Sequence, residues 1–140
     1  MADEKKILVV DDEQSVREVL EVCLTGENFD VSQAENGEQA LKVCKEKRPD
    51  LIILDVKLPD LLGMEVAQII NESPQTYGSP KIIIITGTID TSHRSPVESE
   101  NMRLKAKAQW QKLYGVSDFL SKPFDFEQIL KLVKSSLGQE

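Results

Sequence analysis

Acidic side chains stand directly after two runs of apolar residues, and a hydroxyl and a lysine stand at two similar places. Asp11 and Asp12 follow the run ILVV, and Asp55 follows LIIL. Thr86 follows IIII, and Lys122 comes directly after the segment SDFLS. Carboxylates, hydroxyls and lysines are the side chains that hold hard cations and phosphoryl oxygens. These positions are therefore the candidates for chemistry, provided that the fold brings them together.

The chemistry that suits this set is phosphoryl transfer to a carboxylate. Three carboxylates in one crevice repel one another, and a divalent cation relieves the repulsion. Ligation by oxygen alone selects a hard cation, and Mg²⁺ typically binds through one or two carboxylates together with water and phosphate. A carboxylate can then attack phosphorus to form an aspartyl phosphate. The cation and the lysine would neutralise the charge on the transferred group.

The elements that must position these residues alternate between strands and helices. Apolar runs predict strands at 5–10, 29–34, 51–54, 81–85 and 117–121. Apolar residues at helical spacing predict a helix after each of the first three strands and after the fifth, the second capped by Asn36 and the last by Asp125. The segment SPVE at 95–98 has the signature of a capping box and predicts a fourth helix ending at Tyr114. The segment PQTYGSP at 74–80 is predicted to be a loop.

Five strands alternating with five helices predict an α/β fold whose parallel sheet is covered on both faces. Crossovers in such a sheet are right-handed, so all strands point the same way. Their carboxyl ends therefore lie on one edge, where the ligands of open α/β sheets bind. The residues expected to converge there are Asp11, Asp12, Asp55, Thr86, Ser121 and Lys122.

The length and composition predict a single soluble domain that spans residues 1–140 and lies in the cytoplasm. The net charge of -7 at pH 7 argues against direct binding of nucleic acid or of an anionic membrane. The hydrophilic start MADEKK is unlike a signal peptide, and no apolar run approaches the roughly 18 residues of a spanning helix. Cys23 and Cys44 form no CxxC pair and are expected to be reduced core residues.

Four segments, taken together, resemble the receiver domain of two-component response regulators. They are ILVVDDE, LIILDVKLPDLLG, IIIITG and GVSDFLSKPFD, and the resemblance extends along nearly the whole chain. An acidic pair after a strand carries little information alone, whereas the four segments in this order and at these spacings are highly specific. The resemblance implies a flavodoxin-like, doubly wound, five-stranded parallel sheet of order 2-1-3-4-5 with five helices.

The resemblance also implies a role for each acidic residue of the predicted site. Asp55 would be the phosphoacceptor and a ligand of Mg²⁺, with Mn²⁺ as an alternative ion. Asp12 would bind the ion directly and Asp11 largely through water. The backbone carbonyl of Lys57 would complete the protein ligands.

At the other strand ends, the resemblance implies residues that contact the phosphoryl group or respond to it. Lys122 would contact the group, Thr86 would close onto it, and Phe119 would turn inward as Thr86 moves. The bond between Lys122 and Pro123 is expected to be cis, because a bond before proline is one of the few places where the cis form costs little. That geometry can aim the lysine back into the crevice.

Membership of this family would make the chain a bacterial signalling domain rather than an enzyme, although it would assist its own phosphorylation and dephosphorylation. Its phosphodonor would be a phosphohistidine on a sensor histidine kinase or on a phosphotransfer protein. Formation of a homodimer on phosphorylation is left as an open alternative.

The apolar positions of the first helix spread over roughly 200°, more than a core-facing stripe needs. One shoulder, including Val19, is therefore expected to be exposed beside Asp12 as a docking surface.

Other classes fit the sequence less well. A dinucleotide-binding domain needs glycines after the first strand, and VVDDEQSV has none. A haloacid-dehalogenase-type phosphatase carries a second aspartate two residues after the first, where this chain has Lys57. A receiver-like interaction module that is never phosphorylated stays open, although such modules usually lack one of the acidic or lysine positions that this chain keeps. Any one of these aspartates, taken alone, could simply cap a helix.

The segment GTIDTSHR at 87–94 departs from the family pattern, because it makes the connection between Thr86 and the next helix longer than the usual 2–6 residues. We expect this segment to influence how the phosphorylated state is read or how long it lasts. The acidic positions are unaffected by the departure.

Overall fold

A parallel sheet of five strands forms the centre of the computed structural model, which describes residues 4–86, 116–121 and 124–138. The strands are β1 (Lys6–Val10), β2 (Asp30–Ala34), β3 (Leu51–Asp55), β4 (Lys81–Thr86) and β5 (Asp118–Ser121). Their order across the sheet is β2-β1-β3-β4-β5, and every neighbouring pair is parallel. The predicted flavodoxin-like arrangement is therefore confirmed.

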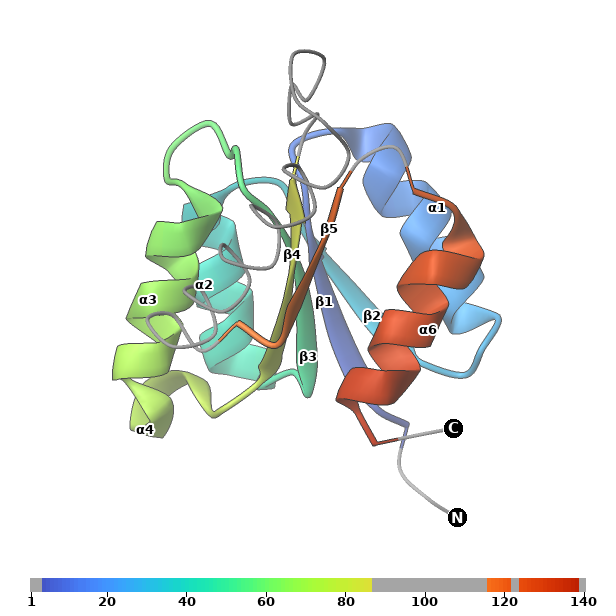
Figure 1. Ribbon diagram of the computed structural model, residues 1–140. Coiled ribbons are helices and arrows are strands. Elements are labelled where there is room, and N and C mark those ends of the chain that lie inside the picture. Colours follow the sequence, from blue (N-terminus) through green and yellow to red (C-terminus); the bar gives the residue numbers. More distant parts are fainter. Residues whose placement is uncertain (1–3, 87–115, 122–123, 139–140) are drawn as a thin grey trace, which may run out of the picture.

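Helices cover both faces of this sheet (Figure 1). On one face lie α2 (Gly37–Lys47), α3 (Gly63–Glu72) and the short α4 (Pro74–Tyr77). On the other face lie α1 (Gln14–Thr25) and α6 (Phe126–Ser136). Among the described residues, no helix is long and apolar enough to cross a membrane.

Strands β1 to β4 each supply side chains to two separate hydrophobic clusters, because alternate residues of a strand point to opposite faces of the sheet. Leu8 and Val10 of β1 belong to the cluster packed by α2 and α3, whereas Ile7 and Val9 belong to the cluster packed by α1 and α6. All four side chains are at most 1% exposed. Burial on both faces explains why the strands carry unbroken apolar runs rather than alternating ones.

Two helices begin with the caps that the sequence predicts. The side chain of Asn36 accepts a hydrogen bond from the backbone N–H of Gln39 at 2.8 Å, at the start of α2. The side chain of Asp125 accepts one from the backbone N–H of Gln128 at 2.9 Å, and the Gln128 side chain accepts one from the backbone N–H of Asp125 at 2.9 Å. These bonds satisfy N–H groups that the first turn of a helix leaves without partners.

The segment 74–80 differs from the prediction of a loop, because its first four residues form α4. Pro74 stands at the first helical position, where the missing N–H costs nothing and the fixed φ suits a helix. Gly78 ends this short helix with a φ of 80°, which glycine adopts without strain. The predicted helix over residues 95–114 and the segment 87–94 lie outside the described residues.

The two cysteines are free and differ in their surroundings. Cys44 of α2 is fully buried, as predicted, and its Sγ–H points to the backbone carbonyl of Tyr77 at 3.6 Å. Cys23 of α1 is only partly buried, which corrects the prediction that it is a core residue. Burial raises the pKa of the Cys44 thiol to about 11, although the nearby Arg48 guanidinium acts in the opposite direction.

The raised pKa of Cys44 predicts that its thiol is unreactive in the native protein. At pH 8 only about one such thiol in a thousand would be ionised, and the thiolate is the nucleophile. Iodoacetamide at pH 8 should therefore alkylate the native protein at Cys23 alone, with a second adduct appearing in mass spectra only after denaturation. A Cys23→Ala variant is the control and should take up no reagent while folded. Equal rates of alkylation at the two cysteines would contradict the prediction.

Candidate functional site

Three carboxylates meet at the carboxyl ends of two adjacent strands, β1 and the central strand β3. Asp11 and Asp12 follow the last residue of β1, and Asp55 is the last residue of β3. One carboxylate oxygen from each of the three lies within 4.8 Å of the others. Asp11 and Asp55 are buried, with 1% and 6% of their surface exposed, while Asp12 is exposed. The structure therefore brings together the three acidic residues that the sequence singles out.

The backbone turn after β1 and a buried arginine hold Asp11 in place. The Asp11 carboxylate accepts a hydrogen bond from the backbone N–H of Glu13 at 2.9 Å. Its backbone carbonyl accepts a bond from Nη1 of Arg17 at 2.6 Å, and its backbone N–H donates to the carbonyl of Ala34 at 3.2 Å. Arg17 is only 9% exposed, so its positive charge is buried next to the backbone of Asp11.

Arg17 is held in turn by polar side chains from β2 and α1. Its Nε donates to Oε1 of Gln33 at 3.1 Å, and Nε2 of Gln33 donates to Glu21 at 2.5 Å. Arg17 is not among the residues predicted from the sequence. Its position could have revealed it, because it lies three residues before Leu20 and seven before Leu24, which places it on the buried face of α1. A charged residue in a buried stripe needs partners.

The loop that leaves Asp55 turns back closely onto the strand. Oδ1 of Asp55 accepts a hydrogen bond from the backbone N–H of Lys57 at 3.2 Å. The backbone N–H of Val56 donates to Ile85 of β4 at 2.9 Å, and that of Gly63 donates to Val56 at 2.7 Å. A Cβ at position 63 would lie 2.3 Å from the backbone carbonyl oxygen of Asp55, so α3 can start here only with glycine.

The remaining predicted site residues are placed only in part. Asp55 pairs with Ile85 in the register of β3 and β4, so Thr86 follows at the same edge of the sheet and pairs with Ser121 of β5. Phe119 pairs with Ile84, two residues before Thr86. For Thr86 and Phe119 the structure describes the backbone alone, and Lys122 and Pro123 lie outside the described residues.

The acidic cluster has the donor set of a hard divalent cation. Like charges held this close repel one another, and a bound cation would relieve the repulsion. All the donors are oxygens, which suits a hard cation. Asp12 is exposed, so water can reach the cluster. Access for water suits Mg²⁺, which keeps several water ligands when it binds to a protein.

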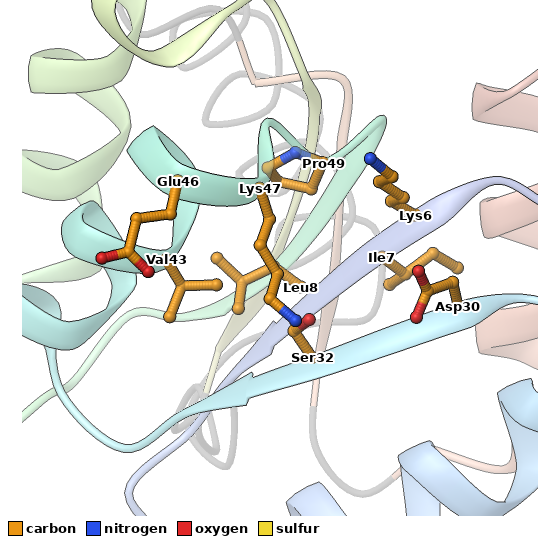
Figure 2. Close-up of a pocket in the computed structure, with 9 residues that line it drawn as sticks. All are labelled: Lys6, Ile7, Leu8, Asp30, Ser32, Val43, Glu46, Lys47 and Pro49. Carbon is orange, nitrogen blue, oxygen red and sulfur yellow. The ribbon is translucent and has the colours of Figure 1, made fainter.

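A hollow of about 250 Å³ lies at the opposite edge of the sheet and is separate from the acidic cluster (Figure 2). Its walls come from the amino ends of β1 and β2 and from the last turn of α2. The lining residues are Lys6, Ile7, Leu8, Asp30, Ser32, Val43, Glu46, Lys47 and Pro49. Ligands of open α/β sheets bind at the carboxyl ends of the strands, so this hollow is not the candidate site.

Comparison with known proteins identifies the family. Residues 7–134 match the model of the response regulator receiver domain, and the chain belongs to that family. It is 33% identical over 135 residues to the response regulator ArlR of Staphylococcus aureus, an alignment that covers 96% of this chain and 53% of that protein. The chain therefore spans about half the length of the curated relatives that it matches.

Solved structures agree with this assignment. A putative response regulator from Chloroflexus aurantiacus has 30% sequence identity and a TM-score of 0.78, covering 98% of this chain and 100% of that one. The chemotaxis response regulator CheY4 of Vibrio cholerae has 28% identity and a TM-score of 0.75, covering 96% of this chain and 99% of that one. The chain is thus a receiver domain of a two-component response regulator.

The close approach of Gly63 to Asp55 predicts that a single methyl group here disturbs the fold. In Gly63→Ala, the new Cβ would meet backbone atoms of Asp55 and Val56, which cannot move aside as a flexible side chain could. We expect a loss of about 1–3 kcal/mol in the free energy of unfolding, as for other overpacked sites, measured by denaturant titration. Gly26→Ala is the control. Gly26 has an α-helical φ of -63°, and an added Cβ would lie 3.4 Å from the nearest carbonyl oxygens, an ordinary contact distance, so we expect no loss in the free energy of unfolding. Equal stability of the two variants would contradict the prediction.

Proposed function

We propose that this chain accepts a phosphoryl group on Asp55, in a reaction that depends on Mg²⁺. The observation that supports the proposal is the meeting of Asp11, Asp12 and Asp55, whose carboxylate oxygens lie within 4.8 Å of one another at the carboxyl edge of the sheet. The phosphodonor is a phosphohistidine on a sensor histidine kinase or on a phosphotransfer protein. The domain is a signalling module of the cytoplasm, and its chemistry is limited to its own phosphorylation and dephosphorylation.

Each residue has a defined task in this proposal. A carboxylate oxygen of Asp55 forms a bond to phosphorus while the bond between phosphorus and the donor histidine nitrogen breaks. Asp12 and Asp55 hold the ion directly, Asp11 holds it through water, and the backbone carbonyl of Lys57 supplies a further oxygen. Bound Mg²⁺, for which Mn²⁺ can substitute, supplies positive charge to the phosphoryl oxygens.

Two strands beyond Asp55 supply the proposed response. Thr86 closes onto the phosphoryl group and Phe119 turns inward with it. The strand register supports the first role, because Thr86 follows Ile85, the partner of Asp55, on the adjacent strand β4; Phe119 lies one strand further on, on β5. The sequence alone supports the tasks of Lys122, which contacts the phosphoryl oxygens, and of the cis bond before Pro123.

Phosphorylation of Asp55 is tested with a small donor that needs no partner protein. Acetyl phosphate with Mg²⁺ should add about 80 Da to the intact mass, one phosphoryl group on a carboxylate. Asp55→Asn should abolish the gain, because an amide is a poor nucleophile. Asp30→Asn is a matched control at the opposite edge of the sheet, at the start of β2, and should gain the full mass.

Gain of the mass by Asp55→Asn at the wild-type rate would refute the assignment. Absence of the gain in the wild-type protein would instead favour an interaction module that is never phosphorylated. The same samples, passed through size-exclusion chromatography with light scattering, test for a homodimer that forms on phosphorylation.

The proposed docking surface for the phosphodonor is the exposed shoulder of α1. Val19 and Val22 are 60% and 70% exposed, although both are large apolar residues in the middle of the helix. This exposure was expected from the width of the apolar arc. The helix begins two residues after Asp12, so a partner packed on Val19 and Val22 would be adjacent to the acidic cluster. Apolar side chains at helical spacing suit packing against a helix of the partner.

A charge placed on this shoulder should separate the two kinds of donor. Val19→Glu should slow phosphotransfer from a sensor kinase that phosphorylates the wild-type chain, because it buries a carboxylate in an apolar contact. The rate with acetyl phosphate should stay unchanged. Asn71→Glu adds the same charge to an exposed position of α3 and should affect neither rate. Equal slowing of Val19→Glu with both donors would indicate a folding defect and remove the support for a docking surface.

A further inference from the structure

Asp60 has no task in the proposed reaction, yet its carboxylate is bound by several backbone groups. It lies in the loop after β3, three residues beyond Lys57. Oδ1 accepts hydrogen bonds from the backbone N–H of Gly37 at 2.8 Å and of Leu61 at 2.9 Å. Oδ2 accepts one from the backbone N–H of Glu38 at 3.0 Å. The bond from Gly37 and then that from Glu38 lower the pKa of Asp60 below its ordinary value, which indicates that they favour the ionised form.

These bonds join the loop to the first turn of a different helix. Gly37 and Glu38 are the first two residues of α2, and their N–H groups have no partner within that helix. The third free N–H, that of Gln39, is capped by Asn36 of the same segment. Asp60 therefore completes the capping of α2 from 22 and 23 residues away, and the positive end of the helix favours its charge.

The contact between the loop and α2 is close enough to require glycine. A Cβ at Gly37 would lie 2.8 Å from Cδ1 and 2.9 Å from Cβ of Leu61, the neighbour of Asp60. At its far end the loop is closed by Gly63 against the backbone of Asp55. The segment between Asp55 and Gly63, which contains Lys57, is thus fastened at its end to the strand and near its middle to α2.

We propose that Asp60 is a positioning residue for the cation site. By fastening the loop to α2, it holds the backbone carbonyl of Lys57 at a constant distance from the carboxylates of Asp11, Asp12 and Asp55. This inference rests on the proposed function, because it assumes that these groups bind a divalent cation. Asp60 itself touches neither the cation nor the phosphoryl group.

The test measures cation binding without phosphorylation. Mn²⁺ is added to the unphosphorylated protein, and the dissociation constant is obtained from the electron paramagnetic resonance signal of the free ion. Asp60→Ala should weaken binding about tenfold, the lower end of what partners behind the ligands contribute to metal affinity. Asp60→Asn keeps one acceptor oxygen and should give an intermediate loss. Gly37→Ala displaces the loop through Leu61 and should weaken binding in the same direction.

Asn36→Ala is the matched control, since it removes a cap from the same turn of α2 without removing a bond to the loop. It should lower the melting temperature about as Asp60→Ala does and leave Mn²⁺ affinity unchanged. Equal weakening by the two alanine variants would show that Asp60 acts only as a helix cap, and wild-type affinity in Asp60→Ala would refute a positioning role. If the wild-type protein binds no Mn²⁺, or binds it equally after Asp12→Asn, the proposed function fails and this inference with it.

Discussion

Parallel pairing of all five strands requires every strand to end at the same edge of the sheet, and the candidate site depends on that constraint. Asp11 and Asp55 are 44 positions apart in the sequence, but β1 and β3 are adjacent in the sheet. The register pairs Val10 with Leu54, so the next residue on each strand is an aspartate. No local feature of either segment brings the carboxylates together; the pairing of the strands does so.

Keeping these charges inside the protein has a free-energy cost that neighbouring groups reduce. Asp11 and Asp55 are almost fully buried, and isolated buried carboxylates are unfavourable. The backbone N–H groups of Glu13 and Lys57 donate hydrogen bonds to the two carboxylates, and the buried guanidinium of Arg17 bonds to the backbone carbonyl of Asp11. The buried carboxylates of this receiver domain are thus held by polar groups of the neighbouring backbone and of Arg17.

The sequence was most informative about features that repeat along the chain, such as the strands, and least informative about residues whose role depends on a single tertiary contact. Runs such as ILVV and LIIL predicted the strands, because a parallel strand buried on both faces is apolar at nearly every position. The aspartates that follow these runs predicted the acidic cluster. The strand order came from the family resemblance. Asp60 was missed because it looks like an ordinary loop residue until α2 is placed beside it. Arg17 was missed because charged residues are usually exposed, although its spacing from Leu20 places it on the buried face of α1. The short helix α4 was missed because proline and glycine also mark turns.

The loop after β3 connects the backbone around Asp55 to several other elements of the fold. Gly37 and Asp60 join the loop to the start of α2, and Gly63 packs against the backbone of Asp55 on β3. Among the described residues, a main-chain bond from the N–H of Val56 to the carbonyl of Ile85 links the loop to β4. The loop is thus tied to β3, β4 and α2, so a shift of α2 would reach the backbone next to Asp55.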